Sequence, residues 1–156
     1  MKDEAAMPPG RRTLMAVFRA VQGLKRSMDR EFEPMDLTGQ QAGLLMRCAS
    51  GAGGLTFEGL AKGLGTDSAG VTRLADRLEA KGLLAREASA EDRRATQLVL
   101  TKAGHDLVPA VRRSFGRWRE RALKGVSDEE QEQLARILER VRANTDAGAQ
   151  AERGAS

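Results

Sequence analysis

The stretch Asp67–Leu100, DSAGVTRLADRLEAKGLLAREASAEDRRATQLVL, decides the fold. Its first part has the apolar period of a helix over Asp67–Lys81, and Gly82 is suited to end that helix in a left-handed conformation. The apolar face of this helix consists of Val71, Leu74, Ala75 and Leu78. Two β-like runs follow, Leu83–Glu87 and Thr96–Leu100, and the polar segment between them is too long for a tight turn. The stretch therefore predicts a helix followed by a projecting β-hairpin.

A second short helix is predicted directly upstream, over Thr56–Leu64, and the connection Gly65–Asp67 joins it to the first. Two helices joined in this way allow the second one to enter the major groove of duplex DNA, which is about 12 Å wide. The hairpin that follows would then lie across the phosphates. This spacing favours a protein that reads double-stranded DNA.

The outward face of the helix Asp67–Lys81 carries the candidate DNA-binding residues. Its N-terminal end has small residues that permit close approach to a base pair, namely Ser68, Ala69 and Gly70. Thr72, Arg73 and Arg77 follow on the same side and can reach bases or phosphates.

An alternative is an ordinary surface helix, in which Arg73 and Arg77 pair with Asp76 and Glu79 or with solvent. The tip of the hairpin favours DNA binding, because the adjacent residues Arg93 and Arg94 have no core to pack against there. Arginine side chains can enter a narrow minor groove, so we expect both to contact DNA.

The rest of the chain is dense with helix signals. One apolar stripe predicts a helix over Arg12–Phe32 that stops before Pro34, and it comprises Leu14, Val17, Phe18, Val21, Leu24, Met28 and Phe32. Thr38 and Gln41 form a capping box that opens a helix ending near Gly51.

Two further helices follow the hairpin. The first covers Lys102–Lys124, and Pro109 within it predicts a kink. Ser127 and Glu130 form a second capping box, and the helix it opens is expected to bury Leu134, Ile137, Leu138 and Val141. The fold class is therefore mainly α with a small β-hairpin wing, a winged helix-turn-helix with additional helices at both ends.

Composition limits the other possibilities. The 156 residues suit one domain, which we expect over residues 11–146, with disordered tails at 1–10 and 147–156. A single cysteine and a single histidine exclude a zinc cluster of thiolates and imidazoles, and no cofactor is indicated.

The apolar runs are too short for a membrane span, and no signal-peptide core is visible, so we expect a cytoplasmic protein without a membrane partner. The net charge of +4 is compatible with a polyanionic partner.

No catalytic set emerges from the sequence, and we expect no enzyme. The segment Gly65–Gly70 differs from a serine nucleophile elbow, because Thr66 stands where that motif requires glycine. His105 lies in the first turn of a helix among polar neighbours and is expected to be solvated.

The stretch Leu37–Leu100 resembles the multiple antibiotic resistance regulator (MarR) family of winged helix-turn-helix proteins. The likeness rests on a set of short motifs: Leu37-Thr38-x-x-Gln41, Gly59-Leu60-Ala61, Val71-Thr72-Arg73-Leu74-x-x-Arg77-Leu78-Glu79-x-Lys81-Gly82-Leu83, Glu91-Asp92-Arg93-Arg94 and Val99-Leu100-Thr101-x-x-Gly104. Ala69 and Gly70 stand where members of the family often carry hydroxyl residues, so the operator sequence cannot be transferred from relatives.

The resemblance implies a homodimeric transcriptional regulator, most simply a repressor of its own or a nearby operon, which binds a pseudo-palindromic operator. Residues 11–36 and 102–146 would form the dimerisation region, and residues 37–101 the DNA-binding lobe. Asp92 would brace the wing by pairing with a neighbouring arginine. A small-molecule effector of unknown identity would bind between the dimer helices and the winged lobe and release the DNA.

Two other interpretations remain open. The fold could serve as a protein-interaction module without DNA. Cys48 could sense oxidants, although it falls on the inward face of its helix without a basic neighbour in sequence, which favours a buried, inert thiol.

Overall fold

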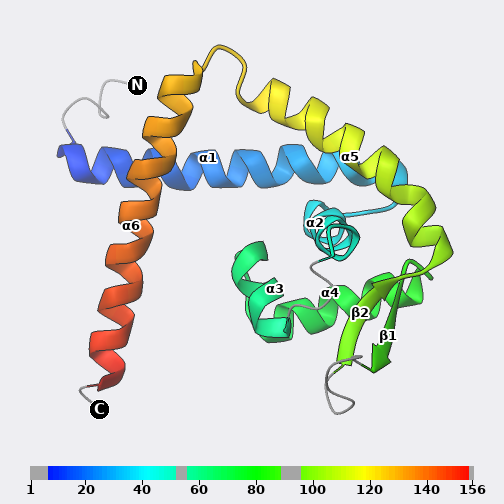
Figure 1. The fold of residues 1–156 in the computed structure, drawn as a ribbon. Helices are drawn as coiled ribbons and strands as arrows, with labels where there is room; N and C mark the ends of the chain where they lie inside the picture. The colour runs from blue at the N-terminus through cyan, green and yellow to red at the C-terminus, as the bar shows by residue number, and fades with distance from the viewer. Residues whose placement is uncertain (1–6, 52–55, 89–95, 155–156) are drawn as a thin grey trace. The chain divides into compact units, whose positions relative to one another are not determined.

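The computed structural model describes residues 7–51, 56–88 and 96–154. Along the chain the elements are α1 (Pro9–Phe32), η1 (Glu33–Met35), α2 (Gly39–Ala49), α3 (Phe57–Leu64), α4 (Ser68–Ala80), β1 (Leu84–Ala88), β2 (Thr96–Leu100), α5 (Lys102–Ala122) and α6 (Asp128–Gly154), as Figure 1 shows. The chain divides into two units, one through Arg119 and one from Glu120 onward, and each is described by itself. The predicted fold class, mainly α with a two-stranded wing, is confirmed.

The first unit is built around one apolar core. Helix α2 contributes Leu44 and Leu45, and the ring of Phe32 at the end of α1 lies 4.6 Å from that of Phe115 on α5, measured between ring centroids. The other core residues come from every element of the lobe: Leu37, Ala42, Leu60, Ala61, Val71, Leu74, Ala75, Leu78, Leu84, Leu98 and Val111. The apolar face predicted for α4 is thus the buried face.

The predicted helix starts are confirmed by their hydrogen bonds. The Thr38 hydroxyl accepts from the Gln41 amide at 3.2 Å, and the Gln41 side chain accepts from the Thr38 amide at 3.0 Å. The same reciprocal pair joins Ser127 and Glu130 at the start of α6. Each box satisfies backbone donors that a helix N-terminus otherwise leaves free.

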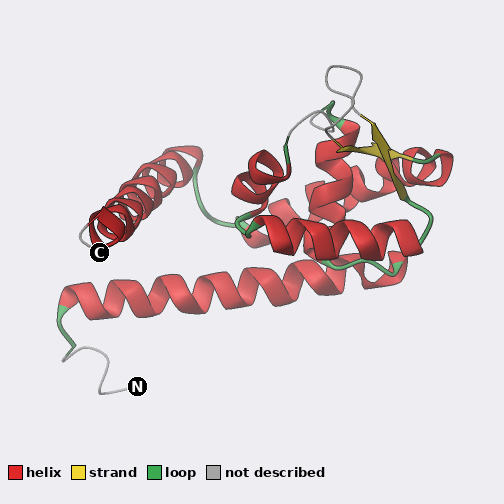
Figure 2. Cartoon of the chain, turned by 90° about the horizontal axis from the view of Figure 1, so that it is seen from below, coloured by secondary structure: helices red, strands yellow, loops and turns green. Residues whose placement is uncertain are grey.

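The wing is an antiparallel pair in which Leu84 lies opposite Leu100 and Ala88 opposite Thr96. Its root enters the core through Leu84 and Leu98, which are 2% and 1% exposed. Figure 2 shows the two strands in yellow beside the helices of their unit. Gly82, with a φ of 68°, supplies the left-handed residue between α4 and β1.

The ends of the chain are more helical than the sequence analysis expected. Helix α1 begins at Pro9, inside the segment expected to be a disordered tail, because proline is well suited to the first position of a helix. Helix α6 continues to Gly154, and residues 147–154 include several good helix formers. Helix α5 runs through Pro109 as one helix, and the kink stays a prediction.

The apolar stripe of α6 is not buried as predicted. Leu134, Ile137 and Leu138 are 48%, 42% and 38% exposed, and Val141 is half-buried. The helical period correctly places these residues on one face, but no described element of the second unit covers that face.

Helix α1 has the same character along most of its length. Leu14, Phe18 and Val21 are 51%, 67% and 54% exposed, whereas Phe32 at the other end of the helix is fully buried. Figures 1 and 2 both show the N-terminal half of α1 extending beyond the other elements of the first unit.

Candidate nucleic-acid interface

Helix α4 presents a polar face to solvent. Its buried residues recur with the helical period, and the residues between them are exposed: Ser68, Ala69, Thr72, Arg73 and Arg77. Five of the six residues proposed for this helix therefore share one accessible surface. Whether they contact DNA stays a prediction, but their side chains have the access that such contacts require.

Gly70, the sixth, is buried in the first turn of the helix. Its amide donates to the Asp67 carboxylate at 2.6 Å, which caps the start of α4. A Cβ atom at this position would overlap the hydroxyl of Thr66. Gly70 therefore allows the connection between α3 and α4 to close tightly over the first turn of α4, and its contact with DNA stays a prediction.

The acids of α4 have a partner outside the helix. Arg86 on β1 donates to the Asp76 carboxylate at 2.7 Å and also pairs with Glu79. These two acids therefore do not pair with Arg73 and Arg77, but both arginines face solvent, as an ordinary surface helix also allows. Arg73 lies 3.9 Å from Asp67, with both side chains mostly exposed, and Arg77 makes no ion pair with any described residue.

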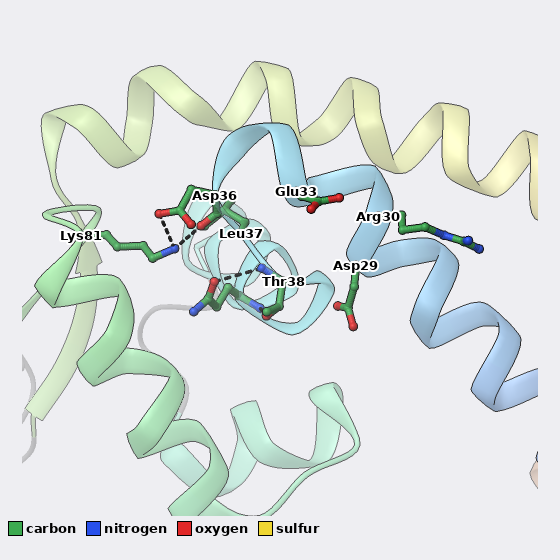
Figure 3. Close-up of a pocket in the computed structure, with 8 residues that line it drawn as sticks. Asp29, Arg30, Glu33, Asp36, Leu37, Thr38 and Lys81 are labelled. Atoms are coloured by element: carbon green, nitrogen blue, oxygen red, sulfur yellow. Dashed lines mark hydrogen bonds and ion pairs between the residues drawn. The ribbon is translucent and has the colours of Figure 1, made fainter.

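The C-terminal end of α4 is tied to the turn after α1. Lys81 Nζ lies 2.9 Å from the Asp36 carboxylate, and Asp36 has a left-handed φ of 52°. Figure 3 shows this pair at the edge of an open depression of about 470 Å³. Asp29 also lines this depression, and its carboxylate accepts a hydrogen bond from the Gly39 amide at 2.8 Å. Two of the carboxylates in this depression therefore have structural partners.

A smaller depression of about 120 Å³ lies on the polar side of α4, lined by Gln40, Thr66, Gly70, Arg73, Leu74 and Arg77. Sequence reasoning missed Gln40 and Thr66, because they come from the start of α2 and from the connection before α4. Only the packing of α2 against α4 brings them beside the arginines.

The three wing residues Asp92, Arg93 and Arg94 lie outside the described residues. The strands that lead to them are described, and they start at the C-terminal end of α4. The proposed contacts of the wing tip stay predictions.

The other candidate groups have ordinary surroundings. Burial raises the pKa of the Cys48 thiol to about 11, which disfavours the reactive thiolate. His105 is exposed. In the part of the chain that the structure describes, no three His, Cys, Asp or Glu side chains cluster as metal ligands would. Over the same residues, no helix has the length and apolar character that crossing a membrane requires.

Comparison with known proteins places this geometry in a family. A model of the MarR family matches residues 35–95. The crystal structure of the transcriptional regulator PA3341 is 30% identical, with a TM-score of 0.72 over 86% of this chain and 97% of that chain. MepR of S. aureus, solved in complex with DNA, is 29% identical, with a TM-score of 0.72 over 83% of this chain and 96% of its own.

A third structure shares the fold at lower identity. CouR of Rhodococcus jostii RHA1, solved with p-coumaroyl-CoA bound, is 22% identical, with a TM-score of 0.73 over 81% of this chain and 88% of that chain. The matched residues 35–95 contain α2, α3, α4 and β1. These elements form and support the exposed polar face of α4 that carries Arg73 and Arg77. The chain belongs to the MarR family of winged helix transcription regulators.

Proposed function

We propose that this chain is a homodimeric repressor that binds a pseudo-palindromic operator at its own or a nearby operon. The observation that carries the proposal is the exposed face of α4, where Arg73 and Arg77 face solvent while Arg86 pairs with the acids of the same helix. MepR, at 29% identity, was solved in complex with DNA, which supports the same use of the fold here.

Each candidate residue has a distinct role in this proposal. Ser68 and Ala69 at the start of α4 let the helix approach the base edges closely. Thr72, Arg73 and Arg77 contact bases or phosphates in the major groove, where arginine can donate two hydrogen bonds to guanine. In the wing, Arg93 and Arg94 contact the minor groove, and Asp92 braces the tip by pairing with one of them.

The exposed apolar face of α1 supports the proposed homodimer. Leu14, Phe18, Val21 and Leu24 are 40% to 67% exposed along one side of this helix. Clusters of large exposed apolar residues mark interaction surfaces, because their exposure to water is unfavourable. Residues 11–36 and 102–146 would form the dimer region and residues 37–101 the DNA-binding lobe. A two-fold axis would then place two α4 helices about one turn of DNA apart, roughly 34 Å.

The proposal includes release by a small-molecule effector. CouR shows that this fold can hold a small ligand. An effector acts by binding one spacing of the two α4 helices more tightly than the other. A site between the dimer helices and the winged lobe has adaptable apolar side chains available, among them Met15, Met28 and Trp118.

The proposal is tested by selection from a library of random duplexes with the purified protein, repeated with candidate small molecules. We expect enrichment of two inverted half-sites about 10 base pairs apart and a steep loss of affinity with added salt. Transcription of a reporter behind the selected site should fall when the protein is supplied. Binding without repression would contradict the repressor role, and enrichment of no palindrome would favour a protein-interaction module.

A further inference from the structure

Arg86 connects the wing with α4, the helix proposed to enter the major groove. It lies on β1 opposite Leu98, and its guanidinium contacts two acids that stand one turn apart on α4. The Asp76 carboxylate is 2.7 Å away, and Glu79 is bonded to the other terminal nitrogen. The Arg86 and Glu79 side chains are 31% and 28% exposed, so the pairing is partly shielded from water.

This pairing changes the charge that α4 offers to a polyanion. Arg73, Asp76, Arg77 and Glu79 are the charged residues of the helix, and they sum to zero. Because Arg86 adds one positive charge beside the two acids, the helix together with Arg86 has one net positive charge. If Asp76 and Glu79 were left unpaired on the same helix as Arg73 and Arg77, their carboxylates would repel the phosphates that these arginines contact. This repulsion would be strongest at low salt.

The same pairing restricts where the wing can point. The wing has a single pair of strands, and its root is anchored in the core by Leu84 and Leu98. Level with Leu98 in the strand register, Arg86 bonds β1 directly to α4. A planar guanidinium that engages two carboxylates has a narrower range of geometries than a lysine ammonium would have.

We propose that Arg86 is a positioning residue for DNA binding: its positive charge partly offsets the charges of Asp76 and Glu79, and it holds the wing against α4, without itself contacting DNA. The inference rests on the proposed function, since it concerns the affinity for an operator. It adds a residue that the sequence analysis did not select and explains how a helix of zero net charge serves a polyanionic partner.

The test measures affinity for the duplex that the wild-type protein selects. Arg86→Ala should bind it roughly tenfold more weakly at about 0.1 M salt, since two carboxylates become unpaired near the phosphates. The affinity of Arg86→Lys should lie between those of the wild type and Arg86→Ala, because lysine restores the positive charge but cannot engage both carboxylates as a planar guanidinium does. The triple variant Arg86→Ala, Asp76→Asn, Glu79→Gln should recover most of the lost affinity, although it still lacks the arginine.

The triple variant separates this role from the others. If Arg86 contacted a phosphate directly, the triple variant would bind as weakly as Arg86→Ala. The number of ions released on binding, measured from the salt dependence of the affinity, would then be smaller by about one than in the wild type. If Arg86 only stabilised the fold, Arg86→Ala would lose its melting cooperativity together with its affinity. Either result overturns the inference, as does wild-type affinity in Arg86→Ala.

The matched control is Arg136→Ala, which removes the same side chain from an exposed ion pair with Glu132 on α6. Arg136 lies on the side of α6 opposite the exposed apolar residues Leu134, Ile137 and Leu138, so the change leaves the apolar face of the dimer region intact. We expect it to bind the duplex as the wild type does, and a loss equal to that of Arg86→Ala would overturn the inference by reducing the effect to net charge. Failure of the wild-type protein to select any duplex would instead count against the proposed function, so the two failures are distinct.

Discussion

Helices α4 and α1 carry equally regular apolar stripes, and the fold treats the two stripes in opposite ways. On α4, Val71 and Leu78 are fully buried, whereas on α1 Phe18 and Val21 are more than half exposed. Helical period therefore determines which residues share a face, but not what that face meets. The winged lobe closes its core with its own elements, and the N-terminal half of α1 has an apolar surface suited to a second copy of the chain.

The largest expected effect concerns the closed core. Leu45→Ala removes a fully buried side chain from α2 and should lower the free energy of unfolding by about 2–5 kcal/mol, because it leaves a cavity. Urea denaturation measures the loss. Leu14→Ala, at an exposed position of α1, is the matched control. A loss of the same size in Leu14→Ala, independent of protein concentration, would remove the contrast between the two stripes.

The next effect concerns the open stripe. Val21→Glu places a charge on the exposed apolar face of α1, which should raise the dimer dissociation constant roughly 100-fold, or about 2.7 kcal/mol. Sedimentation at several concentrations checks it, and circular dichroism should show unchanged helix content. Ala16→Glu, on the opposite side of the same exposed helix, should leave the dimer intact. An unchanged dimer in Val21→Glu would contradict the interface.

A smaller effect is expected at the start of α4. Asp67→Ala removes the side-chain cap on the Gly70 amide and should cost about 1 kcal/mol of stability. Asp67→Asn keeps an acceptor at the cap and removes the charge 3.9 Å from Arg73. We expect Asn to retain the stability and to bind the selected duplex at least as tightly as the wild type. Weaker binding by Asp67→Asn would show that the carboxylate positions Arg73.

The smallest effect concerns Cys48 in the closed lobe. Burial raises the pKa of the Cys48 thiol from its ordinary value of 9.0 to about 11, so the folded protein favours the neutral thiol. The neutral, buried thiol contributes its full share to the free energy of unfolding below pH 9. This contribution is lost as the pH rises from 9 towards 11, because the unfolded chain releases the thiol proton at a lower pH than the folded protein does. At pH 8 iodoacetamide should modify the folded protein roughly 100-fold more slowly than the unfolded one. Equal rates would indicate an open lobe and revive an oxidant-sensing role.

Features that depend on near neighbours in the chain were predicted well. The capping boxes at Thr38 and Ser127 form as expected, since each involves residues three positions apart. The exposed face of α4, with Arg73 and Arg77, follows from the helical period. The wing strands differ from the prediction by one residue at the ends of β1.

Features that depend on contacts between distant segments were not predicted. Gly70 reads as part of a small, exposed helix start, but the packed connection places Thr66 over it. Asp76 and Glu79 could pair with arginines of their own helix, and only the approach of β1 assigns them to Arg86. The exposure of Leu134 and Ile137 has the same origin, because a periodic pattern does not specify the surface that covers it.

The sequence by itself determined the order of the elements, the helix starts and the residues that share each face, because these depend on local hydrogen bonding and on the 3.6-residue period. The tertiary structure alone decided which charges of α4 are neutralised and which apolar stripe is buried. Both depend on segments far apart in the chain, and no local pattern encodes their meeting.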